Sequence, residues 1–201
     1  MNNNSNYWED LYKNKNVKTL PWYLKELDPD LSQELKERNI TKGTFLDLCT
    51  GPGTQAVKLS SLGFNVTGTD ISASAIEKVR KLSNTIEFIQ DDILNSKLNK
   101  KFDYIFDRGC FHTFPPAKRK IYLKEIIKKL TPDGLLFLKC FTGRKQSQGP
   151  YRISKKVIEN TFSKDFYIEK IKDTFFTKDK DQFSQALFVV MQKNSCLKLI
   201  S

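Results

Sequence analysis

Residues 45–56 constrain the fold more than any other stretch of this 201-residue chain. They read FLDLCTGPGTQA, an apolar run followed by a turn with two glycines. The apolar run predicts a short buried strand, and Gly51 and Gly53 can adopt backbone conformations closed to other residues and leave room for a ligand near the main chain. Thr54 can cap a following helix, whose free N–H groups favour ligand oxygens or negative charge. The stretch therefore predicts a strand, a tight turn and a helix around a nucleotide-type cofactor.

Strand and helix patterns alternate after this stretch. The expected strands cover residues 45–49, 64–69, 86–90, 102–107 and 135–141, and the expected helices cover 54–62, 72–82, 115–130 and 154–162. A turn is expected at 131–134, and the last two strands, 166–176 and 186–192, flank the charged turn 178–181 without a helix between them. Such a pattern predicts an α/β fold with a doubly wound, Rossmann-like, seven-stranded mixed sheet that ends in an antiparallel hairpin.

We expect one domain over residues 1–201, with a helical N-terminal cover at 1–42 and a core at 43–193. Helices are expected at 5–14 and 28–38, before the first strand, so they must pack on the sheet edge or cover its binding crevice. Trp8 and Trp22 then serve either as core and lid packing or as ligand-stacking groups. The loop 142–152 is long enough to act as a lid.

The composition of the chain does not identify its binding partner. The chain has 34 basic and 23 acidic residues, for a net charge of +11, but its lysines are spread along the sequence, so they form either a solvated surface or a site for a polyanion. No apolar run reaches the roughly 18–20 residues that cross a bilayer, and the N-terminus lacks signal-peptide features, so we expect a cytoplasmic protein without membrane contact. The four cysteines have no Cys-x-x-Cys spacing, which favours reduced thiols over a disulfide or zinc site.

Acidic residues distinguish between two cofactors. The glycine turn formally fits a dinucleotide fingerprint, with Asp70 where a ribose-binding acid would lie. However, Asp47 lies four residues before the first glycine, where a carboxylate suits a cationic headgroup and repels a pyrophosphate. Asp91 and Asp92 close the third strand, where an adenine amino group can be bound. These acids favour S-adenosylmethionine over a nicotinamide cofactor.

With these motifs, residues 7–193 resemble a class I S-adenosylmethionine-dependent methyltransferase. The resemblance implies that Asp47 and the 51–53 loop face the methionine part of the cofactor, that Asp70 binds the ribose, and that Asp92 and Ile93 flank the adenine. The full expected cofactor set is Trp22, Asp47, Thr50, Gly51, Gly53, Asp70, Ile71, Asp91, Asp92, Ile93 and Asp107.

Three further stretches are similar to the thiopurine, thiol and tellurite-resistance methyltransferases. They are the early Trp8, Tyr12 and Trp22, the run 107–112 (DRGCFH), and the run 149–152 (GPYR). This likeness implies a small-molecule acceptor, with the expected substrate residues Arg108, Phe111, His112, Tyr151 and Arg152. His112 and Arg108 are the candidate catalytic residues; alternatively, His112 is structural and the arginines form salt bridges.

Methyl transfer from a sulfonium is an in-line displacement, so the protein mainly supplies proximity and enclosure, and we expect neither a metal nor a catalytic triad. A soft nucleophile, a thiol or a metalloid, is the expected acceptor. The run 107–110 differs from the Asn/Asp-Pro-Pro-aromatic motif of enzymes that methylate nucleobase amines, so we do not expect nucleic acid as a partner. The alternatives are a methyltransferase for RNA or protein and an NAD-binding oxidoreductase; we expect a monomer or weak dimer.

Cys49, Cys110 and Cys140 fall at or just beyond the ends of strands that are adjacent in the usual order of this fold. They either meet a soft substrate or are small core residues.

Overall fold

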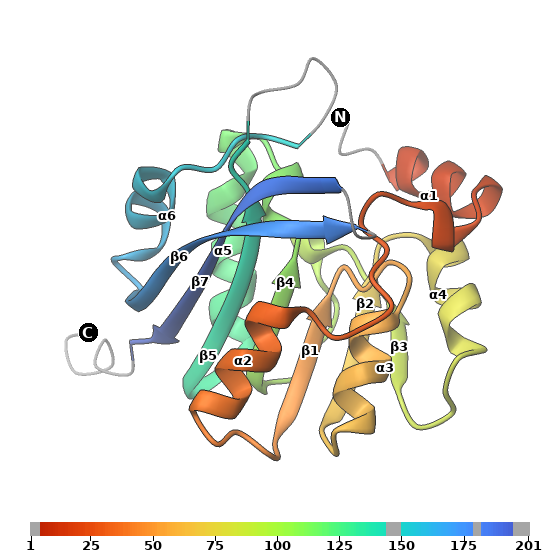
Figure 1. Ribbon diagram of the computed structural model, residues 1–201, viewed down its shortest axis with the longest axis horizontal. Helices are drawn as coiled ribbons and strands as arrows, with labels where there is room; N and C mark the ends of the chain where they lie inside the picture. Colours follow the sequence, from red (N-terminus) through yellow and green to blue (C-terminus); the bar gives the residue numbers. More distant parts are fainter. Residues whose placement is uncertain (1–4, 144–149, 179–181, 195–201) are drawn as a thin grey trace.

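The computed structural model describes residues 5–143, 150–178 and 182–194. One seven-stranded sheet runs through the molecule in the order β3-β2-β1-β4-β5-β7-β6 (Figure 1). The strands are β1 (Thr44–Leu48), β2 (Asn65–Asp70), β3 (Glu87–Gln90), β4 (Phe102–Arg108), β5 (Leu130–Phe141), β6 (Phe166–Lys178) and β7 (Gln182–Lys193). The first five are parallel, and β7 is antiparallel to both β5 and β6. The mixed sheet with its terminal hairpin confirms the predicted fold.

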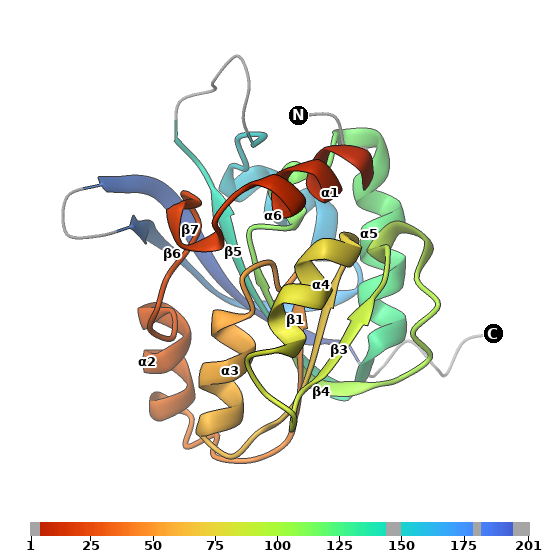
Figure 2. The ribbon, with the colours of Figure 1, turned by 90° about the vertical axis from the view of Figure 1, so that its right-hand side faces the viewer.

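Helices cover both faces of the sheet (Figures 1 and 2). On one face lie α2 (Pro29–Glu37), α3 (Thr54–Ser61) and α4 (Ala73–Arg80), and on the other lie α5 (Pro116–Lys129) and α6 (Lys155–Phe162). The N-terminal α1 (Ser5–Asn14) packs on α4, where Glu9 accepts hydrogen bonds from the Ser72 hydroxyl (2.8 Å) and the Ser74 N–H (3.1 Å). The N-terminal helix is therefore fixed to the start of α4.

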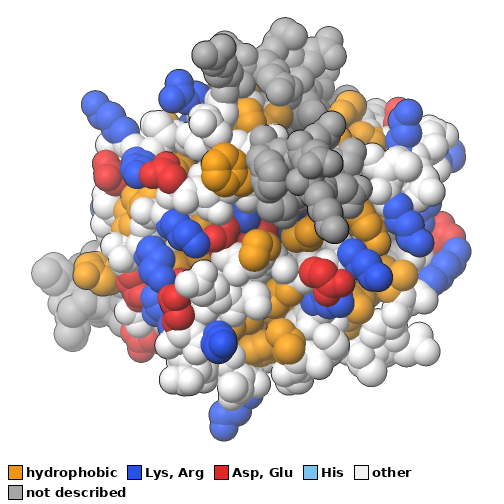
Figure 3. Space-filling model, viewed as in Figure 1, with side chains coloured by type: hydrophobic (Ala, Val, Ile, Leu, Met, Phe, Trp, Pro, Cys, Tyr) orange, Lys and Arg blue, Asp and Glu red, His pale blue; other side chains and the backbone are white. Residues whose placement is uncertain are grey.

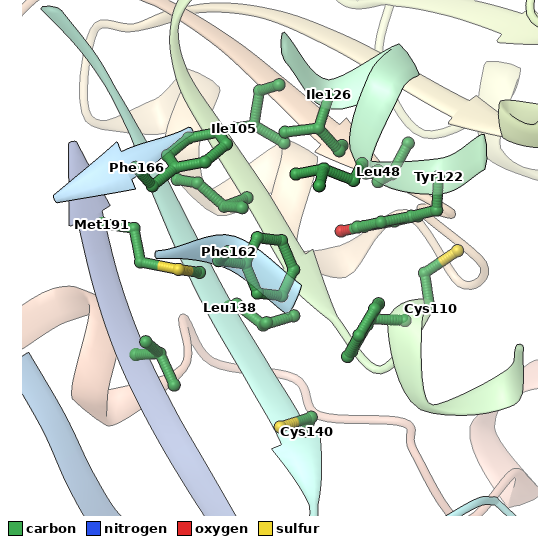
Figure 4. Close-up of a cluster of buried hydrophobic side chains, with 14 of the residues drawn as sticks. Leu48, Ile105, Cys110, Tyr122, Ile126, Leu138, Cys140, Phe162, Phe166 and Met191 are labelled. Atoms are coloured by element: carbon green, nitrogen blue, oxygen red, sulfur yellow. The ribbon is translucent and has the colours of Figure 1, made fainter. Parts of the chain in front are cut away.

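The centre of the sheet is buried on both sides, and β1 shows this with apolar side chains on each face. In β1, Phe45 packs with Leu31 and Ala56 on one face, whereas Leu46 and Leu48 belong to the cluster on the opposite face. Figure 4 shows this second cluster, in which side chains from the strands meet those of α5 and α6. Such burial on both faces is typical of central parallel strands.

Several local expectations need correction. The expected turn 131–134 lies inside β5, which begins at Leu130; its pairing with β4 shifts register there, and Asp133 has a φ of 62°. Thr54 does not cap α3 with its side chain, since Gly53 is the N-cap. Of the expected lid at 142–152, residues 144–149 lie outside the described residues, as do 179–181 of the charged turn.

Basic side chains do not gather on the face shown in Figure 3, where blue groups alternate with red and uncharged ones. Several of them pair with acids, such as Lys170 with Glu34 (2.6 Å) and Lys58 with Glu26 (2.7 Å). Among the described residues, no helix has the length and apolar character needed to cross a membrane.

Candidate cofactor and acceptor site

A cavity of about 370 Å³ opens at the carboxyl ends of the parallel strands. Its walls come from the segments that follow β1 to β4, from the N-terminal Trp8, Tyr12 and Trp22, and from the β6–β7 hairpin. Eight of the predicted site residues line it: Trp22, Asp70, Ile71, Asp91, Asp92, Ile93, Arg108 and His112. The site therefore lies where open α/β sheets bind ligands.

Asp70 ends β2 at the cavity wall. Its carboxylate accepts hydrogen bonds from the N–H groups of Gly51 and Ser72, both at 3.0 Å. Burial raises the pKa of Asp70 to about 6. This carboxylate therefore connects the glycine turn to the start of α4 while it faces the space where a ligand would bind.

Asp47 lies behind the cavity rather than in it. Its buried carboxylate accepts hydrogen bonds from the Thr50 hydroxyl and from the Ala56 N–H (3.1 Å). Burial raises its pKa to about 7. Asp47 thus provides the cap that we expected from Thr54, and it holds the glycine turn in place instead of facing the methionine part directly.

The glycines of the turn are needed for conformation and for packing against protein. Gly51 and Gly53 have φ values of 50° and 73°, which favour glycine, as predicted. A Cβ on Gly51 would collide with the Tyr12 hydroxyl, and one on Gly53 would lie 2.7 Å from the Val79 side chain. Thr50, Gly51 and Gly53 do not line the cavity, so the room expected for a ligand is occupied by α1 and α4.

The loop after β3 forms another wall. Asp92 caps the short helix η2 (Ile93–Asn95) by accepting from the Leu94 N–H (2.9 Å), and Asp91 accepts from the Lys97 N–H (2.8 Å). Ile71 and Ile93 add apolar surface to the same cavity. Acidic groups beside flat apolar surface are suited to an adenine and its amino group.

Asp107 stabilises the segment that follows β4 and does not face the cavity. Its fully buried carboxylate accepts from the N–H groups of Gly109 (3.0 Å), Cys110 (2.7 Å) and Phe111 (3.0 Å) and from the Tyr122 hydroxyl (2.6 Å). Burial raises its pKa to about 6. Asp107 does not line the cavity, and it shapes the short helix η3 (Phe111–Thr113) rather than contacting the cofactor space.

Arg108 lines the cavity and connects it to the N-terminal segment. Its Nε donates to Asp28 (2.8 Å), its Nη1 donates to the Trp22 carbonyl (2.9 Å), and its guanidinium lies 5.3 Å from the centre of the Phe176 ring. The third nitrogen, Nη2, is buried and has no hydrogen-bond partner among the described residues. A buried cationic donor without a partner is costly, and because Nη2 is shielded from the cavity, a ligand group reaches it only if the neighbouring side chains move.

His112 is a hydrogen-bond donor to the cavity rather than a base. Its Nδ1 accepts from the Phe141 N–H (2.9 Å), so the neutral ring must carry its proton on Nε2. Burial, together with the nearby Arg108 charge, lowers the His112 pKa to about 3. The ring is therefore neutral near pH 7 and has no free lone pair on nitrogen, so this geometry favours a hydrogen-bond donor over a base.

The other expected substrate residues lie outside the cavity wall. Phe111 is fully buried between Tyr122 and Phe162, at ring distances of 5.1 and 5.3 Å. Tyr151 packs against the same cluster and donates its N–H to the His112 carbonyl (2.7 Å), and Arg152 is exposed. Gly149 of the same motif lies outside the described residues.

The expectation of free thiols is wrong for two cysteines. Cys49 and Cys110 form a disulfide with a Cα–Cα distance of 5.9 Å, because β1 and β4 are neighbours and their ends meet. Both residues line the cavity, whereas Cys140 is fully buried on β5 in the cluster of Figure 4. Two of the three cysteines therefore reach the site.

Sequence reasoning missed a buried ion network beside the site. Lys139, fully buried on β5, donates to both carboxylate oxygens of Asp28 (3.0 Å each) and to Asp30 (2.7 Å). Asp28 also binds Arg108, and Asp30 also binds Lys172 (2.9 Å). The available signal was a single lysine within the apolar run LLFLKCF, because an isolated buried charge requires a partner.

Among the described residues, no group of three or more His, Cys, Asp or Glu side chains could hold a metal ion. The groups present fit S-adenosylmethionine: Asp70 faces the cavity, and the acids and isoleucines after β2 and β3 line it.

Comparisons with known proteins agree with this geometry. Residues 45–134 match the family model described as a methyltransferase domain. A probable thiol methyltransferase 2 of Arabidopsis thaliana is 30% identical over 159 residues, covering 76% of this chain and 69% of the relative. A thiopurine S-methyltransferase of Legionella pneumophila (strain Paris) is 26% identical over 194 residues, covering 86% of each chain.

The fold has solved counterparts too. A structure from work on the conversion of a disulfide bond into a thioacetal group during echinomycin biosynthesis superposes with a TM-score of 0.81 at 19% identity, covering 96% of this chain and 92% of that chain. One family accounts for the cavity and the acids that line it, for the strand order, and for the relatives. This chain is a class I S-adenosylmethionine-dependent methyltransferase.

Proposed function

We propose that this enzyme methylates the sulfur of small thiols that carry an anionic group. The observation that carries this proposal is the state of His112, whose Nδ1 is occupied and whose pKa is about 3. The lining carboxylates of Asp70, Asp91 and Asp92 are held by backbone N–H groups. A thiol with an ordinary pKa near 8.5 supplies some thiolate at neutral pH and does not need an enzyme base.

Arg108 supports the anionic part of the proposal. Arg108 brings a positive charge to the wall of a largely apolar cavity, where a carboxylate of the acceptor would pair with its guanidinium. The Nε2–H of His112 offers a second, neutral donor in the same wall. Arg108 ends β4 and His112 lies in η3 just after it, which favours an acceptor position beside that strand end.

Bound S-adenosylmethionine supplies an electrophilic methyl group with a neutral thioether as leaving group. Asp70 would hold the ribose hydroxyls, and Asp92 and Ile93 would flank the adenine. Trp8 and Trp22 close the cavity from the N-terminal side and limit the access of water. Arg108 would fix the acceptor so that its sulfur lies in line with the methyl group, and positioning of this kind is the main source of rate in such a displacement.

The names of two relatives favour the same acceptor class. The Arabidopsis relative is called a probable thiol methyltransferase and the Legionella relative a thiopurine S-methyltransferase. Both names place the methyl group on sulfur in those proteins.

The test is methyl transfer from a labelled donor to a matched panel: a mercapto acid, a thiol of equal size without the carboxylate, and the hydroxy acid of the same skeleton. We expect the mercapto acid to have the highest kcat/KM and the hydroxy acid to be inactive. In Arg108→Gln the preference for the mercapto acid over the neutral thiol should fall about tenfold or more, and this ratio is independent of the fraction of folded enzyme. Selenite, tellurite and tRNA complete the panel, and a clear preference for any of them would refute the proposal.

A further inference from the structure

Cys49 and Cys110 place two sulfur atoms in the wall of the cavity. Cys49 directly follows β1, Cys110 follows β4 by two residues, and the strand register sets Leu48 opposite Asp107. Cys49 is partly exposed and Cys110 is 5% exposed, and both line the cavity. The fold therefore brings two cysteines that are 61 residues apart into one pair at the cavity wall.

Among the described residues, no third cysteine or other metal-binding side chain joins this pair to form a metal site. Cys140 is buried in the core, and the described residues hold no cluster of three or more His, Cys, Asp or Glu that could bind a metal. Zinc in structural sites takes four protein ligands, so two sulfurs alone do not satisfy it. Thiolates select soft centres, and a site of two sulfurs matches a soft centre that has two exchangeable bonds.

We propose that the reduced Cys49–Cys110 pair is a binding site for monoorganic trivalent arsenicals, R–As(OH)₂, inside the cavity. Two S–As bonds form and two As–O bonds break; each thiol proton leaves with a hydroxide, so two waters are released and arsenic keeps its oxidation state. The organic group R enters the cavity, whose lining near the pair includes Ile93 and Phe114. The disulfide form must first take two electrons and two protons from a thiol or phosphine reductant, so the site is available only when the pair is reduced.

Mass spectrometry of the whole chain tests this site. The protein is reduced with a phosphine, freed of reductant, and mixed with phenylarsine oxide, which needs two neighbouring thiols for stable binding. We expect one phenylarsenic group per chain after reduction and none without reduction. Cys49→Ser and Cys110→Ser should each abolish the adduct, whereas Cys140→Ser and Cys196→Ser should retain it.

Protection by S-adenosylhomocysteine locates the adduct. Because the pair lines the cavity, saturating S-adenosylhomocysteine should slow the addition about tenfold or more. No adduct on the reduced chain, an adduct that survives Cys49→Ser or Cys110→Ser, or a rate that S-adenosylhomocysteine leaves unchanged would each overturn the proposal. None of these results depends on methyl transfer, so failure here leaves the proposed thiol acceptor untouched.

Discussion

Asp47 and Asp70 lie on either side of the glycine turn and have different tasks. Asp70 faces the cavity, whereas Asp47 holds Thr50 and the start of α3 from behind. We predict that Asp70→Asn weakens the binding of S-adenosylhomocysteine about 10- to 100-fold in calorimetry, because a hydrogen bond to a charged group contributes about 1.5–3 kcal/mol. Asp47→Ala should instead lower the free energy of unfolding by about 1–2 kcal/mol through loss of the cap. The reverse pattern would show that we have assigned the two roles wrongly.

The state of His112 predicts how the free energy of unfolding depends on pH. Its pKa is about 3 in the folded chain and near 6.5 when unfolded, so its stabilising contribution is complete above pH 6.5 and is lost as the pH falls toward 3. His112→Asn keeps an oxygen that can accept from the Phe141 N–H but does not titrate. The free energy of unfolding of the wild type, relative to this variant, should fall by about 2 kcal/mol between pH 6.5 and pH 5. Urea titrations that give a constant difference would contradict the assigned state of the ring.

At the scale of elements, the buried ion network fixes the N-terminal segment to the sheet. Lys139 on β5 holds Asp28 and Asp30 at the start of α2, and Asp28 also receives Arg108 at the end of β4. Removing one partner of a buried pair costs about 3–5 kcal/mol, so we predict a loss of this size in Lys139→Ala by urea unfolding. Lys155, whose pair with Asp173 is exposed, is the matched control, and Lys155→Ala should lose less than about 1 kcal/mol. Equal losses would exclude a special role for the network.

Element boundaries show what local sequence can predict. Apolar residues located the strands, most clearly in β5, where LLFLKCF is nearly continuous because the strand is buried on both faces. Caps were less predictable, because they depend on contacts across the fold: Asp47 caps α3 from a neighbouring strand, and Glu9 binds Ser72 and Ser74 from α1. The expected turn at 131–134 became part of β5 because its pairing with β4 resumes after a register shift.

For the whole molecule, the order of the strands determines which of the predicted site residues lie together. Residues at the carboxyl ends of β2 to β4 lie together as expected, including Asp70, Asp92 and Arg108. What the sequence left open was the direction of each side chain: Asp107 turns into η3 and Phe111 into the core, and only tertiary packing decides such orientations. The disulfide was missed because the absence of a cysteine motif was taken to mean free thiols, although the ends of β1 and β4 meet.

The central claim is that the acceptor thiol loses its proton without the help of an enzyme base, and that the resulting thiolate is the nucleophile. It is tested most directly by the pH dependence of kcat/KM for a series of mercapto acids whose thiol pKa values differ. Since His112 is locked as a neutral donor, we predict that the rise in kcat/KM is centred at the thiol pKa of each acceptor and moves with it along the series. A rise that stays at one pH for every acceptor would reveal an ionising group of the enzyme and contradict this account.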